Sequence, residues 1–368
     1  MHVAFRTDAS LQMGTGHVMR CLTLADALRE RGGSCTFVCR PHLGHLLAVV
    51  TQRGHQALAL PELQEGAEHN RNDTAHAHWL GTDWATDAQD TQQAISACTG
   101  GQPVDWLVVD HYALDARWEE SLRPQANRIM VIDDLADRPH ACDLLLDQNL
   151  GRTEADYGGL LNGKTTILVG PQYALLRPEF AALRVQSLAR RQINPQLRRL
   201  LITMGGVDKD NATGQVLAAL QSCNLPADLR VTVVLGPHAP WLAQVQAQAA
   251  QMHRPTEVLV GVDNMAQLMA ESDLAIGAAG STSWERCCLG LPTLMLVLAT
   301  NQIEAARAIE GANAASTLSI SDDLTENITK SFAKLSDGSV LIATCAAASC
   351  ICDGGGRDRI TNLLVNSK

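Results

Sequence analysis

Short apolar runs alternate with segments of helical periodicity along most of the chain. The runs are continuously apolar, which is typical of parallel strands buried on both faces. In the first half they occupy residues 2–6, 34–40, 106–110, 128–134 and 143–149. Between the first two runs, apolar residues recur at the spacing of one helix face, namely Val18, Cys21, Leu22, Ala25 and Leu28. We therefore expect a doubly wound α/β domain over residues 1–182.

The second half repeats this pattern after a polar, arginine-rich stretch, residues 183–197, which we interpret as a linker. Strands are expected at 200–206, 229–236, 256–262, 273–280 and 292–298, and helices at 211–223, 241–252, 265–272 and 281–290. They predict a second domain over 198–345, followed by a C-terminal helical segment, 346–368, that suits either domain. The predicted fold class is α/β, with two doubly wound, Rossmann-like domains facing a cleft that holds the ligand.

Composition excludes several classes of protein. The 368 residues carry a net charge of −10, no long basic run and only 4% aromatics, which argues against nucleic acid or an anionic membrane as partner. No apolar run approaches the ~18 residues of a membrane span. The N-terminus lacks the regions of a signal peptide, so we expect a cytoplasmic protein.

Neither the cysteines nor a histidine-rich segment predicts a metal site. The eleven cysteines show no paired spacing of a zinc or redox motif, so we expect small buried side chains. His69, His76 and His78 lie in a polar stretch, where a solvated loop is favoured over metal binding.

A glycine-broken loop near the N-terminus is the first candidate site. Gly14 and Gly16 precede a helix that begins at about His17. The first turn of a helix has free N–H donors and a partial positive charge, which suit an anionic or polyhydroxylated ligand. The same field disfavours imidazolium, so His17 is a candidate general base, with a capping histidine as the alternative. Arg6 and Asp8, at the end of the preceding strand, are candidate substrate-binding residues.

Two further strand–turn–helix segments repeat this logic in the second half. Gly205 and Gly206 end one buried strand, and three capping residues follow: Asp208, Asp210 and Asn211. Another strand ends at Gly280, before the hydroxyls of Ser281 and Thr282. Hydroxyls and bare N–H groups at a helix start suit a diphosphate, although plain capping is the alternative.

The residues beyond these turns suit other parts of a nucleotide. Glu285, one turn inside its helix, would accept hydrogen bonds from a diol such as ribose. Asn301 and Gln302 follow the next strand, at the same edge of the sheet. A P-loop, the dinucleotide-binding glycine fingerprint, a serine elbow and a zinc motif are all missing from the sequence, which disfavours those enzyme classes.

Six segments in register resemble one family. They are FRTDAS with MGTGHVMRCLTLADAL, VVDHYALD, DLLLDQN, YALLRPEF, TMGGVDKDN and IGAAGSTSWER with LPTLMLVLATNQ. Together they are similar to the UDP-2,4-diacetamido-2,4,6-trideoxy-β-L-altropyranose hydrolases of pseudaminic acid biosynthesis, from residue 1 to about 310 and again at 353–360. The resemblance implies the glycosyltransferase-B fold of two Rossmann-like domains.

The resemblance also implies site residues. His17 matches the histidine regarded as the base, Tyr112 matches a tyrosine of the same site, and three residues match substrate-binding positions: Arg177, Glu285 and Asn301. The chain is longer than compact members at Glu65–Asp90 and after Ala315. Neither insertion interrupts a motif, but the first alters the expected rim of the site.

The implied activity is cleavage of the anomeric C1–O bond of the UDP-sugar by inverting attack of water. The resemblance also implies a bacterial enzyme of surface-glycan (nonulosonic acid) biosynthesis. Such an enzyme needs no metal or other cofactor and acts as a monomer. Three alternatives stay open: a glycosyltransferase of the same fold, a hydrolysing 2-epimerase and a non-enzymatic sensor of nucleotide sugars.

Overall fold

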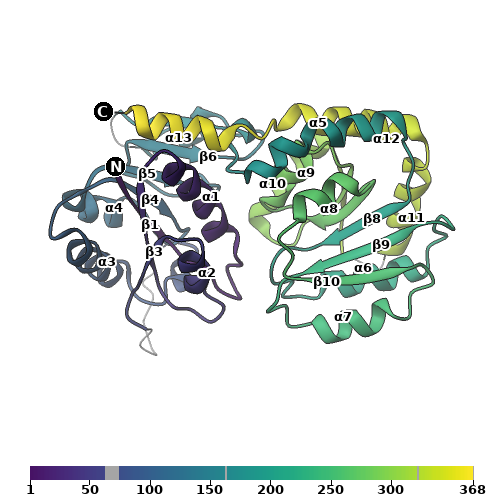
Figure 1. The fold of residues 1–368 in the computed structure, drawn as a ribbon, viewed down its shortest axis with the longest axis horizontal. Helices are drawn as coiled ribbons and strands as arrows, with labels where there is room; N and C mark the ends of the chain where they lie inside the picture. The colour runs from purple at the N-terminus through teal and green to yellow at the C-terminus, as the bar shows by residue number, and fades with distance from the viewer. Residues whose placement is uncertain (63–73, 162–163, 321–322, 368) are drawn as a thin grey trace. The chain divides into compact units, whose positions relative to one another are not determined.

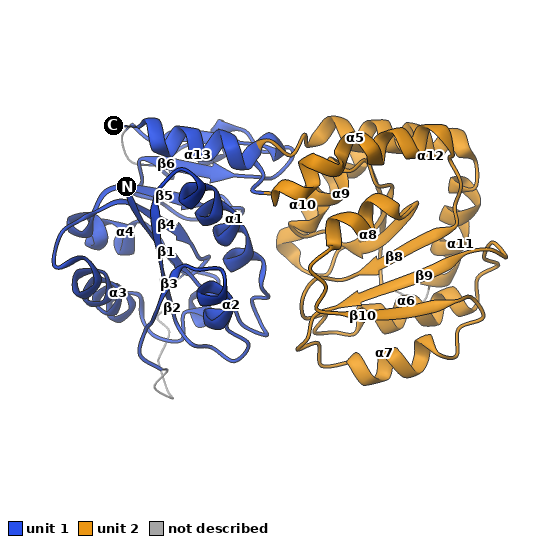
Figure 2. Ribbon diagram, in the orientation of Figure 1, with its two compact units in different colours: residues 1–175, 356–368 blue, residues 176–355 orange. Residues whose placement is uncertain are grey.

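The computed structural model describes residues 1–62, 74–161, 164–320 and 323–367. The chain forms two compact units (Figure 2). Unit 1 comprises Met1–Leu175 and Gly356–Lys368, and unit 2 comprises Leu176–Gly355.

Unit 1 is built on a parallel sheet in the strand order β3-β2-β1-β4-β5-β6-β7 (Figure 1). Its strands are β1 (His2–Thr7), β2 (Ser34–Cys39), β3 (Gln56–Ala59), β4 (Val104–Asp110), β5 (Ala126–Ile132), β6 (Leu144–Asp147) and β7 (Thr166–Val169). Its α-helices are α1 (Gly16–Glu30), α2 (Leu47–Gln52), α3 (Trp84–Thr99), α4 (Ala116–Leu122) and α13 (Gly356–Asn366). Short 3₁₀ turns are η1 (Ala77–Trp79), η2 (Arg123–Gln125), η3 (Glu154–Tyr157) and η4 (Pro171–Tyr173).

Both faces of this sheet are buried, which explains the continuous apolar runs. Along β1, Val3 and Phe5 pack in one core with residues of α1 and α13, while Ala4 packs in another with residues of α3 and α4. Successive side chains of a strand point to opposite faces, so a strand between two helical layers has no polar face.

Unit 2 has a second parallel sheet, in the order β10-β9-β8-β11-β12-β13. Its strands are β8 (Arg199–Thr203), β9 (Arg230–Leu235), β10 (Thr256–Val260), β11 (Leu274–Ala278), β12 (Thr293–Leu296) and β13 (Ser316–Leu318). Its helices are α5 (Pro178–Ile193), α6 (Ala212–Gln221), α7 (Leu242–Ala249), α8 (Met265–Glu271), α9 (Thr282–Cys288), α10 (Ile303–Gly311), α11 (Leu324–Leu335) and α12 (Gly338–Ile351), with the 3₁₀ turn η5 (Thr300–Gln302). The predicted fold class of two doubly wound parallel sheets is confirmed.

The expected linker, residues 183–197, lies largely in helix α5 of unit 2. Its arginines bind backbone carbonyls of neighbouring segments. The Arg191 guanidinium donates to the carbonyls of Met269 and Ser272, both at 2.8 Å, and to that of Leu289 at 3.0 Å. Terminal carbonyls of a helix lack intrahelical partners, so these polar residues fix α5 to α8 and α9.

The stretch Gly338–Asn366 contains an 18-residue window with a mean hydropathy of 1.4, which by length and composition alone is apolar enough to cross a membrane. In the structure it forms two helices, α12 and α13, separated by Cys352–Gly355. The 14 residues of α12 span about 21 Å at 1.5 Å per residue, less than a hydrocarbon core of about 30 Å. Helix α12 packs in unit 2, with Leu341, Cys345 and Ala348 buried, and α13 packs against α1 in unit 1.

Candidate active site

The strand order places a switch point between β1 and β4 in unit 1. The connections from these neighbouring strands leave in opposite directions along the sheet, and ligands of such sheets bind outside the carboxyl ends there. The loop after β1 carries Gly14 and leads to His17 in α1, while β4 ends at Asp110 and is followed by Tyr112. The topology therefore brings together two segments that lie more than 90 residues apart in the sequence.

The loop before α1 adopts a backbone that needs glycine. Gly14 has a φ of +79°, and its N–H donates to the Ser10 carbonyl at 2.8 Å. Gly16 is the first residue of α1, and the preceding Thr15 makes no side-chain cap. No described group occupies the first N–H donors of α1. Gly14 thus shapes the turn that leads to His17.

His17 forms a buried pair with Asp110. Its Nδ1 lies 2.6 Å from Oδ1 of Asp110, whose side chain is fully buried. In a neutral ring, the ionised carboxylate favours the tautomer with the proton on Nδ1, in which Nε2 is the unprotonated nitrogen. Within the described residues, Nε2 has no hydrogen-bond partner. This is the arrangement of a histidine base oriented by a carboxylate.

Arg20 keeps Asp110 ionised. Its guanidinium donates Nε to Oδ2 at 2.6 Å and Nη2 to Oδ1 at 2.7 Å, a bidentate pair. Burial opposes ionisation of this carboxyl, but the charge of Arg20 and the contact with His17 outweigh it and hold the pKa of Asp110 well below its usual range. The His17 imidazole therefore lies against a carboxylate that stays negatively charged.

Tyr112 lies against the imidazole and is itself held by a carboxylate. Its ring meets that of His17 edge to face, with 4.6 Å between centroids. Its hydroxyl donates to Oδ2 of Asp134 at 2.8 Å, and Arg20 donates to the same oxygen at 2.6 Å. Burial and the charge of Asp134 raise the pKa of Tyr112 well above its usual value, so the phenol stays protonated.

Arg6 and Asp8 take a different place from the one we expected of substrate-binding residues. Both side chains are fully buried and form an ion pair, with 2.7 Å between Nη1 and Oδ1. Arg6 also pairs with Asp87 at 2.7 Å, and Asp8 accepts the Arg40 backbone N–H at 2.7 Å. Neither leaves surface for a ligand, so these residues position the loop.

Unit 2 has its own switch point, between β8 and β11. Gly205 and Gly206 follow β8, and Gly205 has a φ of +92°. The donors of the next helix, α6, are already in use. Asp208 accepts the N–H groups of Ala212 at 2.8 Å and Thr213 at 3.0 Å, and Asn211 accepts that of Gly214 at 3.1 Å. The expected capping by Asp208 and Asn211 is present, and it closes this helix start to a diphosphate.

The turn after β11 differs from the turn after β8. Ser281 precedes α9 without a side-chain cap, and the part of the chain that the structure describes offers its hydroxyl no partner. Thr282 accepts a 3.4 Å contact from Arg286. A Cβ added to Gly280 would lie 3.9 Å from Nε2 of Gln302, so the turns after β11 and β12 are neighbours. Asn301, next to Gln302, is exposed.

Glu285 is a half-buried carboxylate for which the described structure shows no hydrogen-bond partner. Burial raises the pKa of Glu285 to about 7, against the pull of Arg177 and Arg286. Arg177 lies 3.4 Å from Glu179 and donates to the Asp263 carbonyl at 3.2 Å. A carboxyl that titrates near neutrality without a partner has acceptor capacity left for a ligand.

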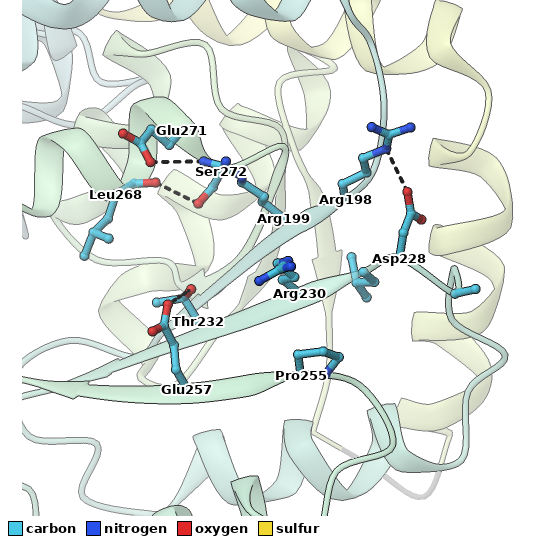
Figure 3. Close-up of a pocket in the computed structure, with 12 residues that line it drawn as sticks. Arg198, Arg199, Asp228, Arg230, Thr232, Pro255, Glu257, Leu268, Glu271 and Ser272 are labelled. Atoms are coloured by element: carbon cyan, nitrogen blue, oxygen red, sulfur yellow. Dashed lines mark hydrogen bonds and ion pairs between the residues drawn. The ribbon is translucent and has the colours of Figure 1, made fainter.

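A hollow of about 740 Å³ in unit 2 lies at the other edge of the sheet, by the amino ends of β8 and β9 (Figure 3). Arg198 pairs with Asp228 at 2.8 Å, and Arg199 pairs with Glu271 at 3.0 Å. Four charges of this hollow are thus neutralised within it. Parallel sheets bind ligands at the opposite edge, so we do not assign the site here.

The structure agrees with most of the expectations for the cysteines and histidines but corrects the one for His76. All eleven cysteines are free, and all but Cys98, Cys223 and Cys350 are buried. Within the described residues no group of three or more His, Cys, Asp or Glu side chains suits a metal ion. His69 lies outside the described residues. His76, expected in a solvated loop, instead packs against Trp79, with 4.4 Å between ring centroids.

Sequence reasoning missed three residues of the unit 1 site: Arg20 as a partner of Asp110, Asp110 itself and Asp134. Asp110 opens the segment DHY, directly after an apolar run, and an acidic residue at the end of a buried parallel strand was the available signal. Arg20 lies one helical turn after His17, a spacing that puts both on one face of α1.

Comparison with known proteins agrees with this architecture. The family model described as Glycosyltransferase family 28 C-terminal domain matches residues 200–348, within unit 2. The UDP-2,4-diacetamido-2,4,6-trideoxy-β-L-altropyranose hydrolase of Campylobacter jejuni is 25% identical over 76% of this chain and 86% of its own length. The spore coat polysaccharide biosynthesis protein SpsG of Bacillus subtilis is 22% identical over 88% of this chain and 85% of its own.

A third relative is longer. The uncharacterized protein MJ1062 of Methanocaldococcus jannaschii is 24% identical over 80% of this chain, and the match spans 55% of that relative's length.

Solved structures show the same fold. MurG of Acinetobacter baumannii superposes with a TM-score of 0.69 at 14% identity, over 99% of both chains. A putative UDP-N-acetylglucosamine 2-epimerase of Listeria monocytogenes gives a TM-score of 0.61 at 14% identity, over 98% of this chain and 94% of its own. The chain has the glycosyltransferase-B fold.

The buried ion-pair network beneath the site generates a prediction about stability. We expect Arg6→Ala to lower the free energy of unfolding by about 3–5 kcal/mol, because Asp8 and Asp87 lose the charge that compensates their burial. Urea denaturation followed by circular dichroism measures this loss.

The matched control is Arg307→Ala. Arg307 pairs with Glu304, and both side chains are more than 70% exposed, at 72% and 74%. An exposed pair contributes little, so this variant should unfold at the wild-type urea concentration. Equal stability of the two variants would contradict the structural role of Arg6.

Proposed function

We propose that this protein is a nucleotide-sugar hydrolase that releases UDP from UDP-2,4-diacetamido-2,4,6-trideoxy-β-L-altropyranose or a close analogue. The observation that carries the proposal is the buried His17–Asp110 pair, in which Nδ1 is engaged at 2.6 Å and no described residue bonds Nε2. The similarity to the Campylobacter jejuni hydrolase supports the choice of substrate. The role fits a soluble bacterial enzyme of pseudaminic acid or related surface-glycan biosynthesis.

In the proposed reaction, His17 Nε2 removes a proton from water as the water oxygen forms a bond to the anomeric carbon. The C1–O bond to UDP breaks on the opposite face, and its electron pair leaves with the diphosphate. The sugar is released with inversion, and the imidazolium returns its proton to solvent. Asp110 stabilises the transient imidazolium, because its carboxylate already accepts the Nδ1 proton.

We assign UDP to unit 2. Glu285 suits the ribose diol, and the turn Gly280–Thr282 suits the diphosphate because its donors are not consumed by side-chain caps. Arg177, Asn301 and Gln302 complete the set of proposed ligands. At Gly205 and Gly206 the absence of a side chain lets the nucleotide approach the backbone closely. The N–H groups at the start of α6 do not bind it in this proposal, because α6 is already capped. The proposal includes no resident metal or cofactor, and a monomer as the working form.

Two other reactions use this fold and are distinguished by their products. A glycosyltransferase would move the sugar to an acceptor, and MurG shares the architecture. A hydrolysing 2-epimerase would exchange the proton at C2, and the putative UDP-N-acetylglucosamine 2-epimerase of Listeria monocytogenes shares the architecture. The deciding experiment is NMR of the UDP-sugar during incubation in D₂O. Release of UDP and a reducing sugar without C2 deuteration supports the proposal, whereas deuteration or acceptor dependence overturns it.

The base assignment predicts the behaviour of His17→Asn. Asparagine keeps a polar side chain beside Asp110 but cannot take the proton from water, so we expect kcat to fall by about 10²-fold or more while UDP binding stays intact. Steady-state kinetics and calorimetry measure the two quantities. His45→Asn, at an exposed position in the same unit, is the matched control and should retain wild-type turnover. Full activity of His17→Asn would reject His17 as the base.

Metal removal gives a second test of the proposed chemistry. Backbone N–H donors and arginine side chains meet the charge of the leaving diphosphate in this proposal, so EDTA should leave turnover unchanged. The rate is measured after dialysis against EDTA and after adding back Mg²⁺. Activity that disappears in EDTA and returns with Mg²⁺ would refute the metal-independent mechanism.

The ribose assignment predicts a pH dependence. Because the pKa of Glu285 is raised to about 7, its carboxylate is lost as the pH falls through that value. Affinity for uridine should therefore weaken below pH 7, since a protonated carboxyl accepts fewer hydrogen bonds. Uridine is the probe because it has no ionisable phosphate. Calorimetry from pH 5.5 to 8.5 should show this step in the wild type and not in Glu285→Gln; the same step in both would exclude Glu285.

A further inference from the structure

The described part of the first insertion folds back onto the unit 1 site. Residues 74–80, with the 3₁₀ turn η1 at Ala77–Trp79, place two aromatic rings beside Tyr112. The ring centroid of His76 lies 5.5 Å from that of Tyr112. Trp79 stacks on Tyr112 at 5.8 Å with an interplanar angle of 27°. Because Tyr112 touches His17, these rings extend an aromatic surface outward from the base.

The segment is fixed at both loops that build the site. Nε2 of His78 lies 2.9 Å from the Gln12 side-chain amide, in the loop between β1 and α1. The Thr74 hydroxyl donates to the Ala113 carbonyl, just after β4, at 3.3 Å. Leu80, at its end, is only 1% exposed and belongs to a core cluster of unit 1. These contacts hold the rings in place relative to His17.

The two rings are only partly covered by protein. His76 and Trp79 are half-buried, whereas Tyr112 beneath them is buried. Burial lowers the pKa of His76, against the pull of Asp137, so its ring is neutral near pH 7. An uncharged aromatic surface that borders a polar catalytic pair suits a ligand with one apolar face and one reacting centre.

We propose that His76 and Trp79 form a stacking platform for the sugar ring of the nucleotide sugar, and so select a deoxygenated, acetamido-bearing hexose. This inference rests on the proposed function. A 2,4-diacetamido-2,4,6-trideoxy sugar has a C6 methyl and two acetamido methyls and keeps one ring hydroxyl, at C3. Contact with an aromatic face favours binding of such a ring. A hexose with more hydroxyls would lose hydrogen bonds to water at this surface, and the aromatic rings would not replace them.

The platform is tested by binding in a His17→Asn background, where the substrate persists. Trp79→Ala should raise the Kd for UDP-2,4-diacetamido-2,4,6-trideoxy-β-L-altropyranose about tenfold, the effect of losing an aromatic contact of ordinary strength. The Kd for UDP should stay within twofold, because the platform faces the sugar alone. Trp84→Ala, which removes a tryptophan from the same insertion at the start of α3, should change neither value.

Two further variants separate stacking from packing. Trp79→Phe keeps a flat ring and should restore affinity to within threefold, whereas Trp79→Leu keeps apolar bulk without a flat face and should behave like alanine. Equal affinity of the Phe and Leu variants, an unchanged Kd in Trp79→Ala, or parallel loss of UDP binding would overturn the platform.

The result is independent of whether hydrolysis is the reaction. A wild-type protein that binds the sugar nucleotide without hydrolysing it, with binding weakened in Trp79→Ala, would sustain the platform and reject the hydrolase. Wild-type hydrolysis with unchanged binding in Trp79→Ala would reject the platform alone.

Discussion

The unit 1 site depends on one buried carboxylate. Asp110 ends β4 and accepts hydrogen bonds from His17 on one oxygen and from Arg20 on both. An ionised carboxyl without solvent is costly unless its lone pairs are filled by charged or strong donors, and here they are. The same pairings fix the imidazole tautomer and the rotation of α1 against the sheet. Fold stability and the orientation of the proposed base thus rest on the same contacts.

The two turns at the switch point of unit 2, after β8 and after β11, are chemically different. In unit 2, Asp208 and Asn211 consume the donors of α6, whereas the turn before α9 keeps an uncapped Ser281 and an unpaired Glu285 nearby. A capping side chain accepts hydrogen bonds from the free N–H groups at a helix start, and these N–H groups can then no longer bind an anion. The glycine turn after β8 is therefore structural, whereas the glycine turn after β11 still has donors and acceptors that a ligand can use.

The sequence predicts the architecture well for two reasons. Strands that are buried on both faces, such as β4 and β8, appear in the sequence as apolar runs, and the turns that follow strands are marked by glycine. It also points to His17, since the turn that presents it is local. It does not reveal the partner of His17, because Asp110 lies 93 residues away and only the strand order joins them. Arg6 looked available for a ligand for the same reason: Asp87, which neutralises it, is 81 residues distant.

The return of the C-terminal helix has a consequence for biosynthesis. Helix α13 places Ile360 and Leu364 in the core beneath α1, and the Leu364 carbonyl accepts the Trp106 indole N–H at 3.2 Å. A ribosome delivers this helix only after all of unit 2 has been made. The first sheet therefore waits with part of one face uncovered while the second domain emerges and folds. During that interval the apolar residues of the first sheet that Ile360 and Leu364 later cover stay exposed.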